Sequence, residues 1–469
     1  MNAVLDLLLD IFRQPAIIVA LISLIGLAVQ RKHFSDVLKG TVRTLVGFLV
    51  LAAGAGVIVG SLSFFGDMFQ HAFNVQGVVP NNEAIVGQVL LDYGSAAALI
   101  FFFGMIVNIA LAATTRFKFI YLSGHVAFYM AAMIAVIFGV AGFEPWAVVL
   151  WGSLAQGLYM TLSPAIVQPY MRKVTGTDDV ALGHTGGAGI ALSGLVATLT
   201  RGKGTSKSTE EIVVPKGLGF LRDTTVIVAV SMAIIYLIVG AFAGAAYIET
   251  ELSGGQNFIV FLLMQAATFS AGVFIILAGV RVVLAEIIPA FKGISDRLVK
   301  DAKPALDVPV TFTFAPNAVL IGFISSFVGG IIGMVAMIFM GTAVIVPGVI
   351  AHFMTGAASG VIGNAAGGRR GAVLGAFSNG IAITFLPLLL LPVLGEIGFA
   401  NSTFSDADYG VVGLFFGWLS VGGGQIAVIA GIILSIAATF VVTFAMRGRD
   451  ARKAAAQAEE SASSESVDA

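Results

Sequence analysis

Long apolar segments separated by short polar ones follow each other along almost the whole chain. A membrane-spanning helix requires about 20 consecutive, mainly apolar residues. Two shorter apolar segments, 80–93 and 183–199, predict re-entrant elements. The longer segments predict an all-α polytopic membrane protein with about 11 transmembrane helices, at 11–30, 41–62, 96–115, 119–141, 146–168, 224–247, 257–280, 316–340, 343–362, 371–394 and 412–446.

Two stretches interrupt the apolar pattern with residues that break helices. Between residues 286 and 322 the chain becomes charged and then contains Pro304, Asp307, Pro309 and Pro316. Proline removes a backbone donor and disfavours helix in the preceding residue. Irregular backbone at membrane depth is tolerated only where protein or a watery cavity satisfies its polar groups, and it is typical of substrate sites in transporters. The last span also contains a glycine triplet, 422–424, which predicts a break.

The loop charges predict the orientation of the spans. Lysine and arginine cluster in alternate loops, and the loops between them contain acids, including Glu83, Asp406 and Asp408, but no bases. Basic loops are cytoplasmic by the positive-inside rule. The N-terminus is therefore predicted outside and the C-terminus inside. The basic clusters lie at 31–43, 116–118, 172–173, 201–222, 281–303, 369–370 and 447–453.

Three pairs of short segments resemble each other in the same order in the two halves of the chain. They are LKGTVRTLV (38–46) with FKGISDRLV (291–299), PNNEAIVG (80–87) with PNAVLIG (316–322), and 121–139 with 345–363. Repeats with discontinuous helices at matching positions are typical of transporters. The pattern therefore predicts two internally repeated halves.

Composition narrows the class of protein further. Of the 469 residues, 58% are hydrophobic and 11% are charged, whereas a soluble domain has about a quarter charged residues. A net charge of −1 gives no basic footprint for nucleic acid. The absence of cysteine excludes thiolate metal sites and cysteine nucleophiles, and the five scattered histidines predict no metal site. We expect no cofactor and no catalytic residue.

The polar segments divide the chain into a membrane domain and two soluble parts. Residues 1–446 are predicted to be embedded in the membrane, with 200–223 as a cytoplasmic loop. The tail, 447–469, is basic and then rich in alanine, glutamate and serine, which favours a charge cluster followed by disorder. The N-terminus lacks the positive start of a signal peptide, so the first span is expected to be retained.

Ionisable residues inside spans usually face a cavity, because each costs about 2.5–3.5 kcal/mol on insertion scales. His125 lies in an apolar segment, with Tyr129 four residues later on the same helical face. A core histidine bonded to a carbonyl is the alternative, and Tyr129 alone is more typical of packing. His352 is interpreted as structural, and Arg281 with Glu286 as an interfacial pair.

Three further residues are candidates because of their surroundings. His184 and Thr185 lie in GHTGGAG (183–189), where glycines leave backbone groups accessible, although a plain loop histidine fits equally well. Asp307 is the strongest single candidate, with a salt bridge to Lys303 or Lys300 as the alternative. Glu83 in PNNEA occupies the matching broken segment of the first half, and solvation in an outer loop is its alternative. Such acceptors fit a polyhydroxylated, neutral or weakly acidic small molecule.

Several of these segments together resemble a known family. KGTVRTLVGFLVLAAGAGVI (39–58), SGHVAF (123–128), LGHTGG (182–187), FKGISDRL (291–298) and TFAPNAV (313–319) resemble the ascorbate family of bacterial phosphotransferase-system IIC components. The resemblance covers about residues 10 to 446. It implies a homodimer in the inner membrane, with a substrate-binding core domain, a dimer-forming scaffold domain and elevator-like alternating access.

The resemblance also implies site residues and partners. By position, the family's ligands for L-ascorbate fall on His125, Tyr129, His184, Thr185 and Asp307. Some members of the family have glutamine where this chain has Tyr129 and Thr185. Their polar helix start, Asp-Thr-Tyr, corresponds to Asn81-Asn82-Glu83 in this chain. A different sugar acid or polyol is therefore also open as the substrate.

In such systems a IIA histidine and a IIB cysteine carry the phosphate, and the IIC component only translocates. A chain without cysteine is not a fused IIB–IIC and is expected to need separate IIA and IIB proteins, with IIB docking on 200–223, 291–303 and 366–371. The rival interpretation is an ion-coupled secondary transporter in which Asp307 or Glu83 carries a proton. A channel is disfavoured because rings of charge and filter repeats are absent.

Overall fold

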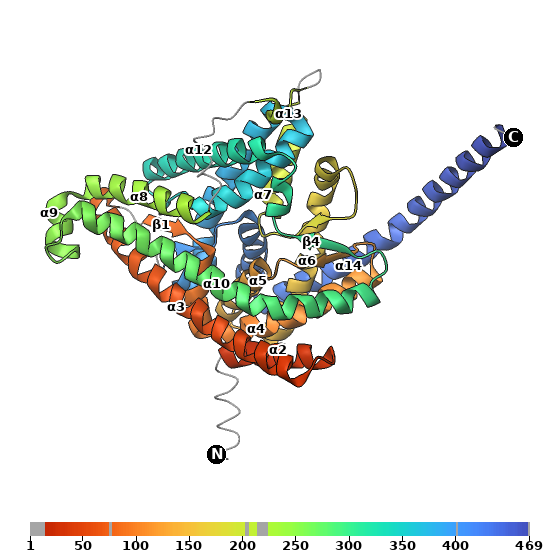
Figure 1. The fold of residues 1–469 in the computed structure, drawn as a ribbon, viewed down its shortest axis with the longest axis horizontal. Helices are drawn as coiled ribbons and strands as arrows, with labels where there is room; N and C mark the ends of the chain where they lie inside the picture. Colours follow the sequence, from red (N-terminus) through yellow and green to blue (C-terminus); the bar gives the residue numbers. More distant parts are fainter. Residues whose placement is uncertain (1–14, 75–76, 202–205, 213–223, 400–401, 468–469) are drawn as a thin grey trace, which may run out of the picture.

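Helices dominate the computed structural model, which describes residues 15–74, 77–201, 206–212, 224–399 and 402–467 (Figure 1). The helix bounds are Pro15–Val29 (α2), Phe34–Phe73 (α3), Asn82–Thr114 (α4), Gly124–Val140 (α5), Pro145–Thr175 (α6), Gly187–Leu199 (α7), Thr224–Ala243 (α8), Ala245–Tyr247 (α9), Phe258–Leu298 (α10), Pro309–Phe312 (α11), Pro316–Met340 (α12), Val349–Leu390 (α13) and Ala407–Val467 (α14).

Membrane-spanning helices account for much of this architecture. Within the described residues, five helices are long and apolar enough to cross a membrane, and a sixth arises if α8 and the bent segment after it form one span. The five are Asn82–Thr114, Phe258–Ile275, Pro316–Met340, Val349–Gly395 and Ala407–Met446. The chain is therefore a multi-pass membrane protein, while the full set of eleven spans stays a prediction.

The described breaks inside α13 and α14 occur at glycine residues. In α14, Gly423 and Gly424 have non-helical backbone angles, with φ of +62° at Gly424, so the predicted break in the last span is confirmed. Gly368, with φ of +64°, breaks α13 between the two segments predicted as separate spans. A positive φ is a conformation that glycine adopts readily and other residues disfavour.

Two of the predicted boundaries are wrong. Residues 80–93 do not form a separate re-entrant element, because α4 continues without interruption from Asn82 to Thr114. Asp92 and Gly94 weaken the apolar pattern there, but no proline breaks the hydrogen bonding and Asp92 is exposed. At the other end of the chain, α14 is helical as far as Val467, where composition favours disorder.

Short strands are the feature that the all-α prediction misses. Two three-stranded parallel sheets occur among the described residues, in the orders β5-β1-β6 and β2-β4-β3. Strands of only two to four residues are too short to show a periodic pattern of apolar residues, so the sequence pattern cannot reveal them. Their bounds are Gly77–Pro80 (β1), Phe119–Tyr121 (β2), Ala181–Leu182 (β3), Lys303–Leu306 (β4), Val344–Ile345 (β5) and Ser402–Thr403 (β6).

The sheets bring helix N-termini together. Strands β2, β3 and β4 run parallel and lead into α5, α7 and α11, while β1, β5 and β6 lead into α4, α13 and α14. In the second sheet Tyr121 pairs with Ala305, and Ala305 with Ala181, so the three strand ends are in register. The residues that follow these strands are thereby placed at one edge, beside free backbone N–H groups.

Six of the helices form two packed groups. Helices α3, α8 and α10 pack against each other, and α7, α12 and α13 form a second group (Figure 1). Glycines permit the close approach of α12 and α13, since a Cβ on Gly322 would lie 2.7 Å from the Cα of Gly360.

Candidate functional site

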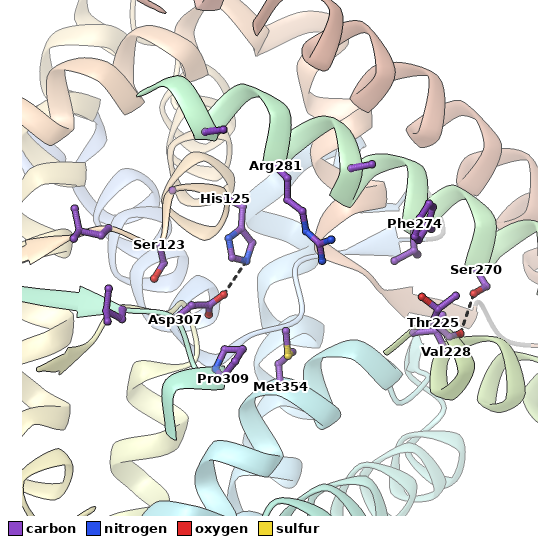
Figure 2. A pocket seen from close by; sticks show the side chains of 16 residues that line it. Ser123, His125, Thr225, Val228, Ser270, Phe274, Arg281, Asp307, Pro309 and Met354 are labelled. Atoms are coloured by element: carbon purple, nitrogen blue, oxygen red, sulfur yellow. Dashed lines mark hydrogen bonds and ion pairs between the residues drawn. The ribbon is translucent and has the colours of Figure 1, made fainter. Parts of the chain in front are cut away.

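One carboxylate faces two imidazoles at the edge of the second sheet. Asp307 Oδ2 lies 3.5 Å from Nε2 of His125 (Figure 2). Its Oδ1 lies 3.7 Å from Nε2 of His184. The three residues follow β4, β2 and β3 respectively. The sheet therefore brings together the three residues that the sequence singled out most strongly.

Local backbone fixes the position of Asp307. Its Oδ1 accepts a hydrogen bond from the Val308 N–H at 2.7 Å, and Pro309 opens the short helix α11 immediately afterwards. Lys303 bonds to Asp178 instead, so the structure does not support the alternative salt bridge to this lysine. Partial burial opposes ionisation of Asp178, but its hydrogen bonds from Arg172 and Lys303 prevail and lower the pKa of this carboxyl below its usual value.

A backbone contact sets the tautomer of His184. The side chain is 4% exposed, and its Nδ1 accepts a hydrogen bond from the Gly186 N–H at 2.9 Å. Since this nitrogen is an acceptor, the neutral ring carries its proton on Nε2, the atom that faces Asp307. His184 thus holds the carboxylate from behind, while His125 and Asp307 keep 24% and 28% of their side chains exposed.

His125 and Asp307 line a cavity of about 640 Å³. Its other wall is one face of α10, with Phe274, Ala278 and Arg281 (Figure 2). Of the residues predicted to bind substrate, His125 and Asp307 contact this cavity. The others lie deeper in the protein: Tyr129, His184, Thr185, Asn82 and Glu83.

Two of these deeper residues lie within the apolar interior. Tyr129 is 1% exposed, and its hydroxyl has no hydrogen-bond partner among the described residues. Its ring contacts that of His125 edge-on, with centroids 6.1 Å apart. Glu83 is 5% exposed at the start of α4, so its interpretation as a solvated outer-loop acid is wrong.

The chain matches the family described as EIIC-GAT, the sugar-specific permease component of the phosphotransferase system (PTS), over residues 10–408. The chain belongs to this family. The resemblance read from the sequence is thereby confirmed, and the protein is a transport subunit.

A curated relative of this permease is the ascorbate-specific PTS system EIIC component of Mycoplasma pneumoniae. The two are 28% identical over 454 residues, which cover 85% of this chain and 66% of the relative. The permease thus spans slightly less than two thirds of the relative's length.

Asp406 is a buried residue next to the carboxylate–imidazole cluster that sequence reasoning missed. It is 2% exposed and accepts hydrogen bonds from Thr185 Oγ1 at 2.6 Å and Asn82 Nδ2 at 3.2 Å, and it lies 4.0 Å from Nδ1 of His184. Its assignment to a solvated outer loop is wrong, because the segment after β6 folds inward. Asp406 therefore connects Asn82 to Thr185 from behind the carboxylate–imidazole cluster.

Asp408 is a second buried acid that the sequence analysis assigned to an outer loop. It is 3% exposed. Its carboxylate accepts hydrogen bonds from the Ala188 N–H at 2.5 Å, from Ser163 Oγ at 2.9 Å and from the Tyr159 hydroxyl at 2.9 Å. These bonds tie the start of α14 to α6 and α7. The available signal was the position of both acids at the start of a long apolar helix, since Asp406 directly precedes α14 and Asp408 lies in its first turn, where acids cap helices.

Proposed function

We propose that this permease translocates L-ascorbate, or a similar sugar acid, across a bacterial inner membrane while a separate IIB protein phosphorylates it. The observation that carries the proposal is the carboxylate of Asp307 between two imidazoles at the cavity wall. At the cavity wall this cluster offers one strong acceptor, Asp307, and one adaptable donor or acceptor, His125, which suits adjacent hydroxyl groups. The name of the Mycoplasma pneumoniae relative supports ascorbate among the sugar acids.

In the proposed substrate site, the predicted residues form two layers, one at the cavity wall and one deeper in the protein. Asp307 and His125 contact the substrate directly in this arrangement, and His184 orients the carboxylate. Thr185, Asn82, Glu83 and Tyr129 contribute when the substrate penetrates further, and the partnerless hydroxyl of Tyr129 favours such a contact.

We further propose elevator-type alternating access in a homodimer, with the N-terminus outside and the C-terminus cytoplasmic. Helices α3, α8 and α10 serve as part of the scaffold, and the two small sheets move with the core. The position of the cavity supports this division, since one wall carries Asp307 and the other is a face of α10.

An ion-coupled secondary transporter is the second candidate function. The burial of Glu83 favours it, because a carboxyl group buried near a substrate site can bind and release a proton.

Uptake into vesicles distinguishes the two functions. Right-side-out vesicles containing the permease enclose IIA, IIB, phosphoenolpyruvate and the general phosphocarrier proteins that pass phosphate from phosphoenolpyruvate to IIA, and labelled ascorbate is supplied outside. Uptake that requires phosphoenolpyruvate, persists with an uncoupler and yields phosphorylated product is the expected result. Uptake that the uncoupler abolishes and that is indifferent to IIB contradicts the proposal and supports ion coupling.

Arg370→Ala is expected to weaken binding of IIB. The neighbouring Arg369 donates to the Ser208 carbonyl at 2.9 Å and approaches Glu211, whereas Arg370 is exposed at the break in α13. We therefore expect Arg370 to be the arginine of this pair that is free to meet an acidic partner. Most of the proposed docking loop 200–223 lies outside the described residues.

A pull-down with purified IIB measures the effect, with a several-fold loss expected for removal of a charge at the edge of an interface. Lys173→Ala is the matched control, because this exposed cation lies in another basic cluster, in the last turn of α6. Equal retention of IIB by the Arg370→Ala variant and the wild type removes the assignment.

A further inference from the structure

Arg281 projects from α10 into the cavity that Asp307 and His125 face from the opposite wall (Figure 2). Its neighbours on this face are Phe274, Ala278 and Ala285, which lie at helical spacings from it. The two alanines leave room around the guanidinium. Arg281 follows the apolar, membrane-crossing part of α10, which ends at Ile275, and its exposed side chain lines the cavity.

The two walls of this cavity carry opposite charges. Among the lining residues that the structure describes, Arg281 is the one permanent cation and Asp307 the one carboxylate. Asp307 already has two imidazoles and a backbone N–H close to it. Arg281 has no acidic side chain within 4.0 Å in the described part of the chain, although its charge acts on His125. The guanidinium is therefore available to a ligand.

An anionic substrate requires such a cation. Asp307 repels a negative group and accepts hydrogen bonds from neutral hydroxyls, so it cannot bind the charged end of a sugar acid. A guanidinium is planar and delocalised and binds planar oxyanions through two parallel hydrogen bonds. A substrate with an oxyanion at one end and hydroxyls at the other fits between the two walls.

We propose that Arg281 binds the anionic group of the substrate, which in ascorbate is the enolate of the lactone ring, and makes the permease select anionic sugar acids over uncharged sugars and uncharged lactones of the same size. This inference rests on the proposed transport function. It is an alternative to the interpretation of Arg281 with Glu286 as an interfacial pair, since the side chain of Glu286 lies outside the described residues. The acidic end of the substrate contacts α10, while its hydroxyl end contacts Asp307 and His125.

The test compares two ligands that differ in charge. L-Ascorbate is a monoanion at neutral pH, whereas L-gulono-1,4-lactone has a related carbon skeleton and hydroxyls but no charge. Binding of both is measured by isothermal titration calorimetry on the purified full-length protein. In Arg281→Gln we expect the Kd for ascorbate to rise about ten- to hundredfold, which is the range for hydrogen bonds to a charged group, and the Kd for the lactone to stay within about twofold.

Two further variants complete the design. Arg281→Lys keeps the charge without the planar fork and is expected to retain part of the preference for ascorbate. Lys173→Gln removes an exposed cation in the last turn of α6, away from the cavity, and is expected to leave both affinities unchanged.

The contrary outcomes are distinguishable. A wild-type protein that binds neither ligand overturns the proposed substrate class, and this inference with it. A wild type that binds ascorbate and an Arg281→Gln variant that binds it equally well overturn the role of Arg281 alone. Equal losses for both ligands overturn it too, because they indicate a packing role in place of charge selection.

Discussion

Replacing Asp307 with asparagine is expected to reduce ascorbate uptake by at least about a hundredfold. The carboxylate is the strongest hydrogen-bond acceptor at the cavity wall, and the imidazoles of His125 and His184 are arranged around it. A hydrogen bond to a charged group contributes about 1.5–3 kcal/mol, so losing two such bonds from substrate hydroxyls to this carboxylate reaches this magnitude. Asparagine preserves the shape and removes the charge.

Initial uptake rates in the vesicles described above measure the effect, together with direct ascorbate binding to the purified variant. Asp179→Asn is the matched control, since Asp179 is exposed in the loop after α6. Near-normal binding by a folded Asp307→Asn protein would show that this carboxylate is not a substrate ligand.

Replacing Asp408 with alanine is expected to lower the free energy of unfolding by about 3 kcal/mol or more. Three buried donors, on Ala188, Ser163 and Tyr159, lose their common acceptor in this variant. Each buried donor left unsatisfied costs about 1–3 kcal/mol. Because these donors belong to α6 and α7, the start of α14 loses its attachment to both helices.

Unfolding monitored against denaturant in detergent or bicelles gives the free energy. Asp408→Asn retains one acceptor oxygen and is expected to lose less than half as much. Asp179→Ala, on the surface, is expected to change the free energy by no more than about 0.5 kcal/mol. A fully stable Asp408→Ala protein would mean that the three donors find other partners.

Much of the fold was predictable because the membrane imposes it. A bilayer requires long apolar helices, and glycines in such helices mark the points where the backbone departs from helix, as at Gly368 and Gly424. The continuity of α4 through Asp92 was not predictable, since one exposed acid weakens the apolar signal without breaking any backbone hydrogen bond. The six short strands were also invisible, because each is paired with a segment distant in sequence.

The cluster of His125, His184 and Asp307 was predictable because polar residues within apolar sequence are unfavourable unless they have a function. Asp406 and Asp408 escaped the same reasoning. Both acids follow a polar loop. An acid in a loop is predicted to be exposed to solvent unless the residues that bury it are known. Those partners, such as Asn82 and Ser163, lie more than two hundred residues earlier in the chain.

The order of strands in the two sheets also determines when the site can form during synthesis. The middle strand of the first sheet, β1, is the earliest of its three, so it waits for β5 and β6. The middle strand of the second sheet, β4, is the latest of its three, so β2 and β3 have no partner in that sheet until residue 306 has been made. Asp406 arrives a hundred residues later still. A ribosome that stops between residues 307 and 406 leaves a chain that already contains both histidines and Asp307 but cannot yet complete the support behind them.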